Sequence, residues 1–142
     1  NVRFGDPECQ VTLPLVKTDL FSLLHGAATD GLSNVELELH AGSSVTVVLA
    51  SEGYPAAPVK GRPVIGFEEA LATSTYGDCW VNVAGVAVSE EGQFIASGGR
   101  VLSCTAMGSD LAETQKTAYG LLSTLDLEGG HHRTDIAHRA MH

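Results

Sequence analysis

The stretch from Cys79 to Ala106, CWVNVAGVAVSEEGQFIASGGRVLSCTA, decides the fold of this 142-residue chain. Two apolar, strand-like runs, 79–88 and 94–97, flank the five residues SEEGQ, a loop of hairpin length that contains a glycine. A third strand is expected over residues 101–106, directly after the triplet GGR. These three runs predict an antiparallel β-meander.

The segments on either side of the meander supply another strand and a helix. Residues 44–50 form a β-branched apolar run that fits a buried strand. Asp110 and Glu113 have the spacing of a capping box, which marks the start of a helix. Apolar residues recur after this box at helical spacing: Leu111, Ala118, Leu121, Leu122 and Leu125. Several strands and one long helix on a sheet face indicate an α+β fold.

The N-terminal third is expected to be helical. Asp6 is placed as the N-cap of a short helix with Pro7 at its first position, and this helix stops before Pro14. Thr18 can cap a second helix with an apolar face, which Asp30 and Gly31 end. Residues 31–44 are the expected boundary, and residues 51–63, with three prolines, are expected to be loop.

The first eight residues, NVRFGDPE, combine an amide, a guanidinium and two carboxylates on one short segment. Hard oxygen ligands suit Mg²⁺, and an arginine neutralises anionic substrate groups. Each of these residues can also have a purely structural role. Asn1 can be a frayed terminal residue, Asp6 a helix cap, and Glu8 a partner of the helix dipole.

The segment NVRFGDPE resembles the metal-binding signature of the glycinamide ribonucleotide synthetases (phosphoribosylamine–glycine ligases), which are members of the ATP-grasp superfamily. In that family a strand reads Glu-Phe-Asn-x-Arg-Phe-Gly-Asp-Pro-Glu, and its glutamate and asparagine bind magnesium. Three further blocks are similar to the same family in order and spacing: residues 50–55 (ASEGYP), 98–102 (GGRVL) and 133–139 (RTDIAHR). The resemblance covers essentially the whole chain.

The resemblance implies a fragment of a longer enzyme. Residues 1–43 would be the C-terminal tail of an ATP-grasp domain, and residues 44–142 the C-terminal domain of the ligase, a small antiparallel sheet packed against helices. The parent enzyme would join glycine to 5-phosphoribosylamine through a glycyl phosphate in de novo purine synthesis. The isolated chain is expected to be inactive, because the metal-binding glutamate and the nucleotide-binding elements would lie upstream.

The resemblance also assigns roles to four residues. Asn1 would bind the metal, and Arg3 and Asp6 would be catalytic, near the transferred phosphoryl group and the attacking amine. Arg100 would bind the ribose phosphate of the substrate. The GGR triplet alone is a weak motif, because GG before a strand is common turn chemistry. For Arg100 a structural ion pair is the competing interpretation.

Cofactors and partners follow from the same resemblance. The intact enzyme would use Mg²⁺ or Mn²⁺ with ATP as co-substrate, and would bind glycine, 5-phosphoribosylamine and the remainder of the ATP-grasp polypeptide. Another ATP-grasp carboxylate–amine ligase of purine metabolism, or a noncatalytic α+β packing or interaction module, are the alternatives.

Composition narrows the class of protein. A net charge of −9 with only 8 Lys+Arg argues against nucleic-acid binding, which needs a basic face. No apolar run approaches the roughly 20 residues needed to span a bilayer. Three cysteines, Cys9, Cys79 and Cys104, form an odd count without CxxC spacing, and the last two lie in apolar runs. Buried free thiols are expected, which favours the reducing cytoplasm.

Overall fold

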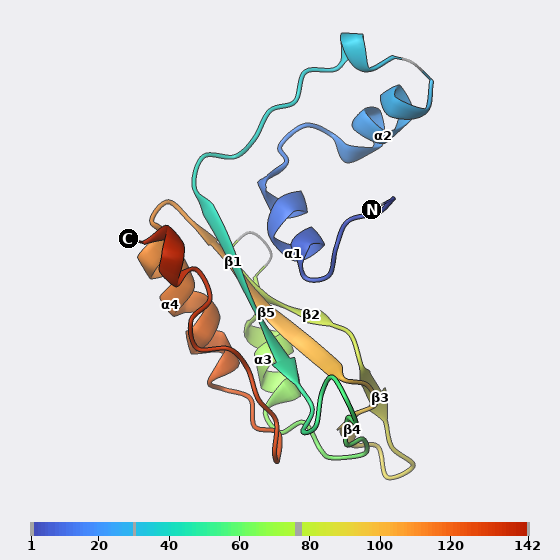
Figure 1. Cartoon of the computed structure of the whole chain (residues 1–142), viewed down its shortest axis with the longest axis vertical. Helices are drawn as coiled ribbons and strands as arrows, with labels where there is room; N and C mark the ends of the chain where they lie inside the picture. Colours follow the sequence, from blue (N-terminus) through green and yellow to red (C-terminus); the bar gives the residue numbers. More distant parts are fainter. Residues whose placement is uncertain (1, 30, 76–77, 142) are drawn as a thin grey trace.

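A three-stranded antiparallel sheet forms the centre of the chain, in a computed structural model that describes residues 2–29, 31–75 and 78–141 (Figure 1). Strand β5 (Arg100–Gly108) lies between β1 (Ser43–Ala50) and β2 (Cys79–Val83), and both neighbours pair with it. The registers place Val47 of β1 and Val81 of β2 opposite Cys104. The predicted α+β fold with a small antiparallel sheet is confirmed.

The expected β-meander is wrong in its connections. The run 79–88 is two strands, because it breaks at Ala84 and Gly85 and continues as β3 (Val86–Val88). Strand β3 pairs only with β4 (Phe94–Ala96), across the predicted hairpin loop, in a second small sheet. The break is tight: a Cβ on Gly85 would lie 2.8 Å from the Gly98 Cα. The chain therefore leaves the main sheet for the hairpin and returns to its middle as β5.

Two helices cover one face of the main sheet. Helix α4 (Leu111–Leu122) packs on β1 and β5, and α3 (Phe67–Thr73) packs on β2. Asp110 caps α4 as predicted, since its Oδ1 accepts from the Glu113 N–H at 2.9 Å. Their shared core consists of apolar residues from the sheet and both helices: Val45, Val47, Leu49, Phe67, Leu102, Cys104, Ala106, Ala118 and Leu122.

Helix α3 carries no capping signal that sequence analysis could detect. Its N-cap is Gly66, with φ +78°, and no side chain caps it. The helix is held by packing instead. Phe67 is 3% exposed, and its ring lies 4.7 Å from that of Phe94.

The opposite face of the sheet carries a cluster of polar side chains beside the buried Trp80. Because successive side chains of a strand alternate between faces, Thr46, Thr105 and Asn82 share the side away from the helical core. The Thr46 and Thr105 hydroxyls lie 2.7 Å apart, and Asn82 Nδ2 donates to Thr105 Oγ1 at 2.6 Å. The buried hydroxyls of Thr46 and Thr105 therefore have hydrogen-bond partners.

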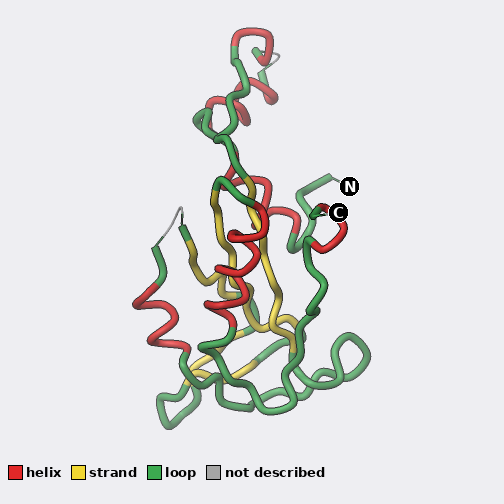
Figure 2. The backbone as a smooth tube through the Cα atoms, turned by 90° about the vertical axis from the view of Figure 1, so that its left-hand side faces the viewer, coloured by secondary structure: helices red, strands yellow, loops and turns green. Residues whose placement is uncertain are grey.

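The N-terminal third extends beyond the end of the sheet (Figures 1 and 2). Helix α1 (Glu8–Thr12) lies against β1, and α2 (Leu20–Ala28) lies farther out. Two predicted caps are wrong. Pro7 rather than Asp6 occupies the N-cap of α1, and Asp19 rather than Thr18 caps α2.

The correction at α2 has a clear cause. Asp19 Oδ2 accepts from both the backbone N–H and the hydroxyl of Ser22, and these bonds lower the pKa of Asp19. Thr18 bonds instead to the extended segment 36–38. Short 3-10 turns cover Leu13–Leu15, Leu32–Asn34 and His138–Ala140. Within the described residues, no helix has the length and apolar character that crossing a membrane requires.

Candidate functional site

Two of the residues expected at the site meet across the sheet. Arg100 Nη2 lies 2.9 Å from Asp6 Oδ2, so the segment before α1 is joined to the first residue of β5. Both side chains remain accessible, with 40% of Arg100 and 42% of Asp6 exposed. The pair therefore lies at the surface, where a ligand can reach the guanidinium.

Tyr54 is the second partner of Arg100. Arg100 Nη1 donates to the Tyr54 hydroxyl at 3.1 Å, and the guanidinium carbon lies 6.0 Å from the centre of the ring. The hydrogen bond to Tyr54 and the ion pair with Asp6 each engage one terminal nitrogen of a side chain that carries five N–H donors. The remaining donors can serve an anionic group.

The GGR triplet is a point of close backbone packing. A Cβ on Gly99 would lie 2.3 Å from the Tyr54 ring, and Gly98 accepts a bond from the Ser51 hydroxyl at 2.8 Å. The Ser51 N–H also donates to the Gly99 carbonyl at 2.8 Å. Glycine is therefore required here by contact with the ASEGYP loop, and the two blocks form one unit.

The Asp6 carboxylate is engaged at both oxygens. Oδ1 accepts from Gln10 Nε2 at 2.8 Å, while Oδ2 faces Arg100. The predicted capping role falls to neither oxygen, since helix α1 has no side-chain cap. Glu8 lies in the first turn, as expected, and its Oε2 accepts from the Gly5 N–H at 2.8 Å.

Arg3 lies exposed and bonds locally, from Nη1 to the Phe4 carbonyl at 2.8 Å. No contact joins it to the Asp6–Arg100 pair within the described part of the chain. Asn1, the expected metal ligand, lies outside the described residues. Among the residues that are described, no three His, Cys, Asp or Glu side chains gather as a metal site would require.

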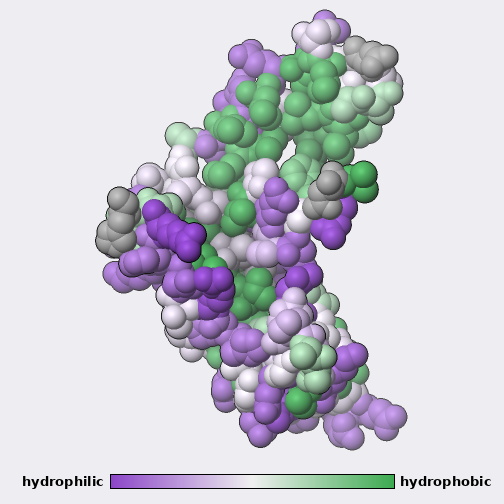
Figure 3. Space-filling view, in the orientation of Figure 1, coloured by the Kyte–Doolittle hydropathy of each residue, from purple (hydrophilic) through white to green (hydrophobic). Residues whose placement is uncertain are grey.

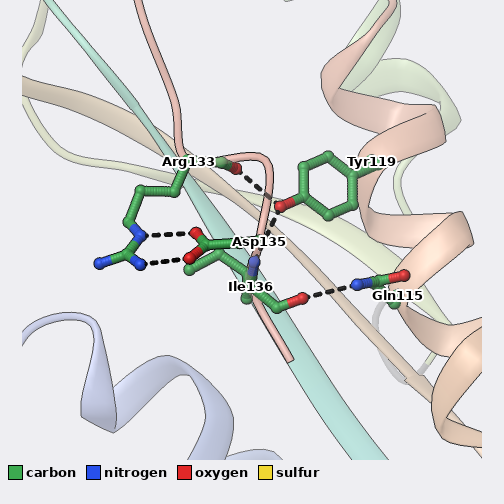
Figure 4. Close-up of polar contacts among 5 residues, drawn as sticks. All are labelled: Gln115, Tyr119, Arg133, Asp135 and Ile136. Atoms are coloured by element: carbon green, nitrogen blue, oxygen red, sulfur yellow. Dashed lines mark hydrogen bonds and ion pairs between the residues drawn. The ribbon is translucent and has the colours of Figure 1, made fainter. Parts of the chain in front are cut away.

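The C-terminal block RTDIAHR is fixed to α4 by two side chains of that helix, Tyr119 and Gln115 (Figure 4). The Tyr119 hydroxyl donates to the Arg133 carbonyl at 2.6 Å and accepts from the Ile136 N–H at 3.2 Å. Gln115 Nε2 donates to the Ile136 carbonyl at 2.6 Å. The two-pronged bond from Arg133 lowers the pKa of Asp135. These contacts are structural, and they hold the end of the chain against α4.

The same block reaches the N-terminal segment. Ile136 and Ala137 border a cavity of about 240 Å³ whose other walls are Pro7, Glu8 and Val11 of the α1 region and residues 44–46 of β1. Residues from both ends of the chain thus gather along β1.

The family that this sequence fits is now clear from comparison with known proteins. The sequence pattern of the family "Phosphoribosylglycinamide synthetase, C domain" matches residues 44–139. The chain belongs to this family.

Individual relatives extend the match to nearly the whole chain. The phosphoribosylamine–glycine ligase of Leifsonia xyli subsp. xyli is 45% identical over 144 residues, which cover 99% of this chain and 33% of the relative. That of Caulobacter vibrioides is 43% identical, covering 99% of the chain and 32% of the relative. The chain therefore spans about a third of the length of the curated relatives it matches, and the resemblance to part of this ligase is confirmed.

A solved structure supports the fold. The crystal structure of phosphoribosylamine–glycine ligase from Thermotoga maritima matches with a TM-score of 0.69 and 33% sequence identity. The match covers 95% of this chain and 32% of that one. The likeness therefore includes the N-terminal third as well as the family's C domain.

Sequence reasoning missed Tyr54 and Gln10 as members of the site. The ASEGYP block lies in the segment expected to be loop, where Gly53 has a positive φ of +78°. Nothing in the spacing of that block indicates a contact with Arg100, because the two residues meet only through the pairing of β1 with β5.

Proposed function

We propose that this chain is the C-terminal part of an ATP-dependent ligase that joins glycine to 5-phosphoribosylamine. ATP would phosphorylate the glycine carboxylate. The amine of phosphoribosylamine would then form the amide bond as the acyl–phosphate bond breaks and phosphate leaves. The observation that carries the proposal is the Asp6–Arg100 pair, in a chain whose relatives are phosphoribosylamine–glycine ligases.

Arg100 is proposed to bind the phosphate of phosphoribosylamine. A surface ion pair contributes only about 0–1 kcal/mol to stability, so the pair with Asp6 is a weak reason to place an arginine here. An exposed guanidinium that keeps further N–H donors without a partner among the described residues suits a phosphate group, which accepts two parallel hydrogen bonds from arginine. This comparison favours the binding role over the purely structural one.

Asp6 and Arg3 are proposed to act at the reacting groups. The Asp6 carboxylate holds Arg100 and can orient the amine of phosphoribosylamine or the ammonium of glycine. Arg3 is exposed and carries the charge needed near a transferred phosphoryl group. Its local bond to Phe4 is weak enough to be exchanged for a ligand.

The described residues do not form a magnesium site by themselves. Both Asp6 oxygens face Gln10 and Arg100, and the Glu8 carboxylate accepts from Gly5. We therefore propose that ATP and the divalent metal, Mg²⁺ or Mn²⁺, are held mainly by the remainder of the ligase, with Asn1 as the metal ligand that this chain supplies. The proposed location of the enzyme is the cytoplasm.

An apolar groove in the N-terminal third is the observation that favours the remainder of the ATP-grasp polypeptide as the binding partner. The groove is about 600 Å³ and is lined by apolar side chains of the N-terminal third, including Phe4, Leu24, Leu37 and Leu39. These four side chains are 47–58% exposed, and Figure 3 shows apolar surface gathered over this part of the molecule. Patches of this kind mark interaction surfaces.

The proposed division into residues 1–43 and 44–142 rests on a difference between the two segments: the first carries the exposed groove, and the second has a buried core. The groove lies almost entirely before residue 44, where the C-domain match begins. The later segment has its own core of β1, β5, α3 and α4. Asp6 and Arg100 would then join the two units across the site.

ADP formation by the full-length protein that carries this chain tests the proposal. We expect ADP to form only when both glycine and phosphoribosylamine are present, and the isolated chain to show neither turnover nor measurable binding of Mg·ATP. Turnover that ignores phosphoribosylamine, or micromolar binding of ATP by the isolated chain, about −8 kcal/mol, would contradict it. The packing-module alternative predicts that truncating this chain lowers stability without changing the substrate dependence.

A further inference from the structure

Tyr54 contacts Arg100 through both its hydroxyl and its ring. The hydroxyl accepts from Arg100 Nη1 at 3.1 Å, and the guanidinium carbon lies 6.0 Å from the ring centre, at the outer limit of a cation–π contact. Asp6 holds the other terminal nitrogen, Nη2, at 2.9 Å. The two ends of the guanidinium therefore have different partners on different segments of the chain.

The Tyr54 ring is itself fixed by its surroundings. It occupies the space that a Cβ on Gly99 would fill, since that atom would lie 2.3 Å from Cδ2 and 2.8 Å from Cε2. Pro58 Cγ would lie 3.2 Å from the same Cβ and borders the ring's site. Because residue 99 has no side chain, the Tyr54 ring can lie beside the backbone next to Arg100.

The backbone that carries Tyr54 is equally constrained. Its N–H donates to the Ser51 carbonyl at 3.1 Å, and Ser51 is bonded to Gly98 and Gly99 on the neighbouring strand connection. Gly53 takes φ +78° and accepts from the Ala57 N–H at 2.8 Å. Hydrogen bonds within the loop and to Gly98 and Gly99 therefore anchor the backbone that carries Tyr54.

We infer that Tyr54 is a positioning residue that orients Arg100 for the phosphate of the substrate. The inference rests on the proposed role of Arg100. Long arginine side chains lose rotamer freedom when they bind a ligand, and a guanidinium already held at both ends loses less. The Tyr54 hydroxyl and Asp6 each hold one terminal nitrogen, Nη1 and Nη2, and the other N–H groups of the exposed guanidinium would then bind the anion.

Tyr54→Phe isolates the hydroxyl, because phenylalanine keeps the ring that fills the space at Gly99. In the full-length ligase we expect KM for phosphoribosylamine to rise roughly 3- to 10-fold, less than on loss of Arg100 itself, because the lost hydrogen bond only orients the guanidinium and does not touch the phosphate. The KM values for ATP and glycine should stay within about twofold. The melting temperature should stay close to that of the unmutated ligase, since an exposed hydrogen bond contributes little to folding.

Tyr119→Phe is the matched control. Its hydroxyl also makes two hydrogen bonds, to Arg133 and Ile136, but these only fix the C-terminal block to α4. We expect this variant to lower the melting temperature and to leave the ratio of the three KM values unchanged. A structural tyrosine and a positioning tyrosine are thus distinguished by opposite readouts.

A double-mutant cycle separates failure of this inference from failure of the proposed function. In an Arg100→Ala background, Tyr54→Phe should have no further effect on KM, because the group it positions is gone. If Arg100→Ala itself leaves KM for phosphoribosylamine unchanged, the proposed role of Arg100 is wrong. If Arg100→Ala raises that KM but Tyr54→Phe does not, or if Tyr54→Phe raises all three KM values alike, the positioning role of Tyr54 is overturned.

Discussion

Asp6 and Arg100 form an ion pair with 2.9 Å between Oδ2 and Nη2, although they lie far apart in the sequence. Asp6 precedes the first helix, and Arg100 begins the central strand of the sheet. The pair joins the proposed end of the ATP-grasp domain to the C domain.

The N-terminal third should be the first part of the isolated chain to be digested. Residues 31–41 lie outside the sheet and include the exposed side chains Leu32, Leu37 and Leu39. We expect limited proteolysis to leave a resistant fragment that begins near Ser43, since the later residues have their own core. Mass spectrometry identifies the cut sites. A first cut within α4, near Leu121, would contradict the proposed division.

The apolar groove gives a second prediction. In the full-length ligase, Leu37→Ser should lower the free energy of unfolding by about 1.5–3 kcal/mol, because the partner buries this side chain. In the isolated chain, where Leu37 is 58% exposed, the change should be within about 0.5 kcal/mol.

Val88→Ser is the control for the groove. Val88 is 62% exposed and lies on the hairpin, away from the groove, so its substitution should be near neutral in both proteins. Urea denaturation of the four variants measures the difference. Equal effects of Leu37→Ser in the two proteins would argue against a partner in the groove.

Local sequence rules predicted those parts of the fold that local interactions determine. The β3–β4 hairpin loop and the Asp110 cap depend on neighbouring residues, and both are confirmed. The break at Gly85 and helix α3 were not predicted, because a contact with Gly98 and packing against Phe94 determine them. The Asp19 cap was missed because Thr18 offered the same chemistry one residue earlier.

The residues of the candidate site also fall into those that the sequence predicted and those that only the fold brought together. Family blocks singled out Asp6 and Arg100 separately, and their contact required the fold. Tyr54 was missed because its partner, Arg100, lies on a distant segment of the chain. Gln10 was missed because its partner, Asp6, was expected to cap the helix instead. Their roles follow from geometry that spacing in the sequence does not contain.

Two glycines should respond to alanine in opposite directions. At Gly66, φ is +78°, and a Cβ would lie 2.2 Å from the Thr124 carbonyl oxygen, so Gly66→Ala should cost about 2–4 kcal/mol of stability. At Gly120, in α4, nothing lies within 4 Å of the added atom. Gly120→Ala should therefore stabilise by up to about 1 kcal/mol, since alanine favours helix. Chemical denaturation of both variants checks the signs, and a neutral Gly66→Ala would refute the stated geometry.

Cys104 should make the chain sensitive to alkaline pH. Burial and the nearby Cys79 raise the pKa of the Cys104 thiol to about 12 in the folded chain, whereas an unfolded cysteine titrates near about 8.5. The folded state thus disfavours the thiolate. Its contribution is complete below about pH 8.5 and falls as pH rises toward 12, by up to about 1.4 kcal/mol per pH unit.

Cys104→Ala provides the comparison for this slope. The variant should be less stable at neutral pH, because it leaves a small void in a fully buried position. Between pH 9 and 11, however, its free energy of unfolding should decline less steeply than that of the unmutated chain. Parallel curves would show that the thiol does not titrate on unfolding.

The most direct test of the account is the kinetics of Arg100 variants in the full-length ligase. Arg100→Lys keeps the charge but loses the fork that pairs two phosphate oxygens, so KM for phosphoribosylamine should rise while KM for ATP stays nearly unchanged. Arg100→Ala should reduce kcat/KM for phosphoribosylamine about 10- to 150-fold, the equivalent of roughly 1.5–3 kcal/mol. The melting temperature should change little, because the ion pair with Asp6 is half exposed. A lowered melting temperature with all substrates affected alike would instead show that Arg100 only holds the structure together.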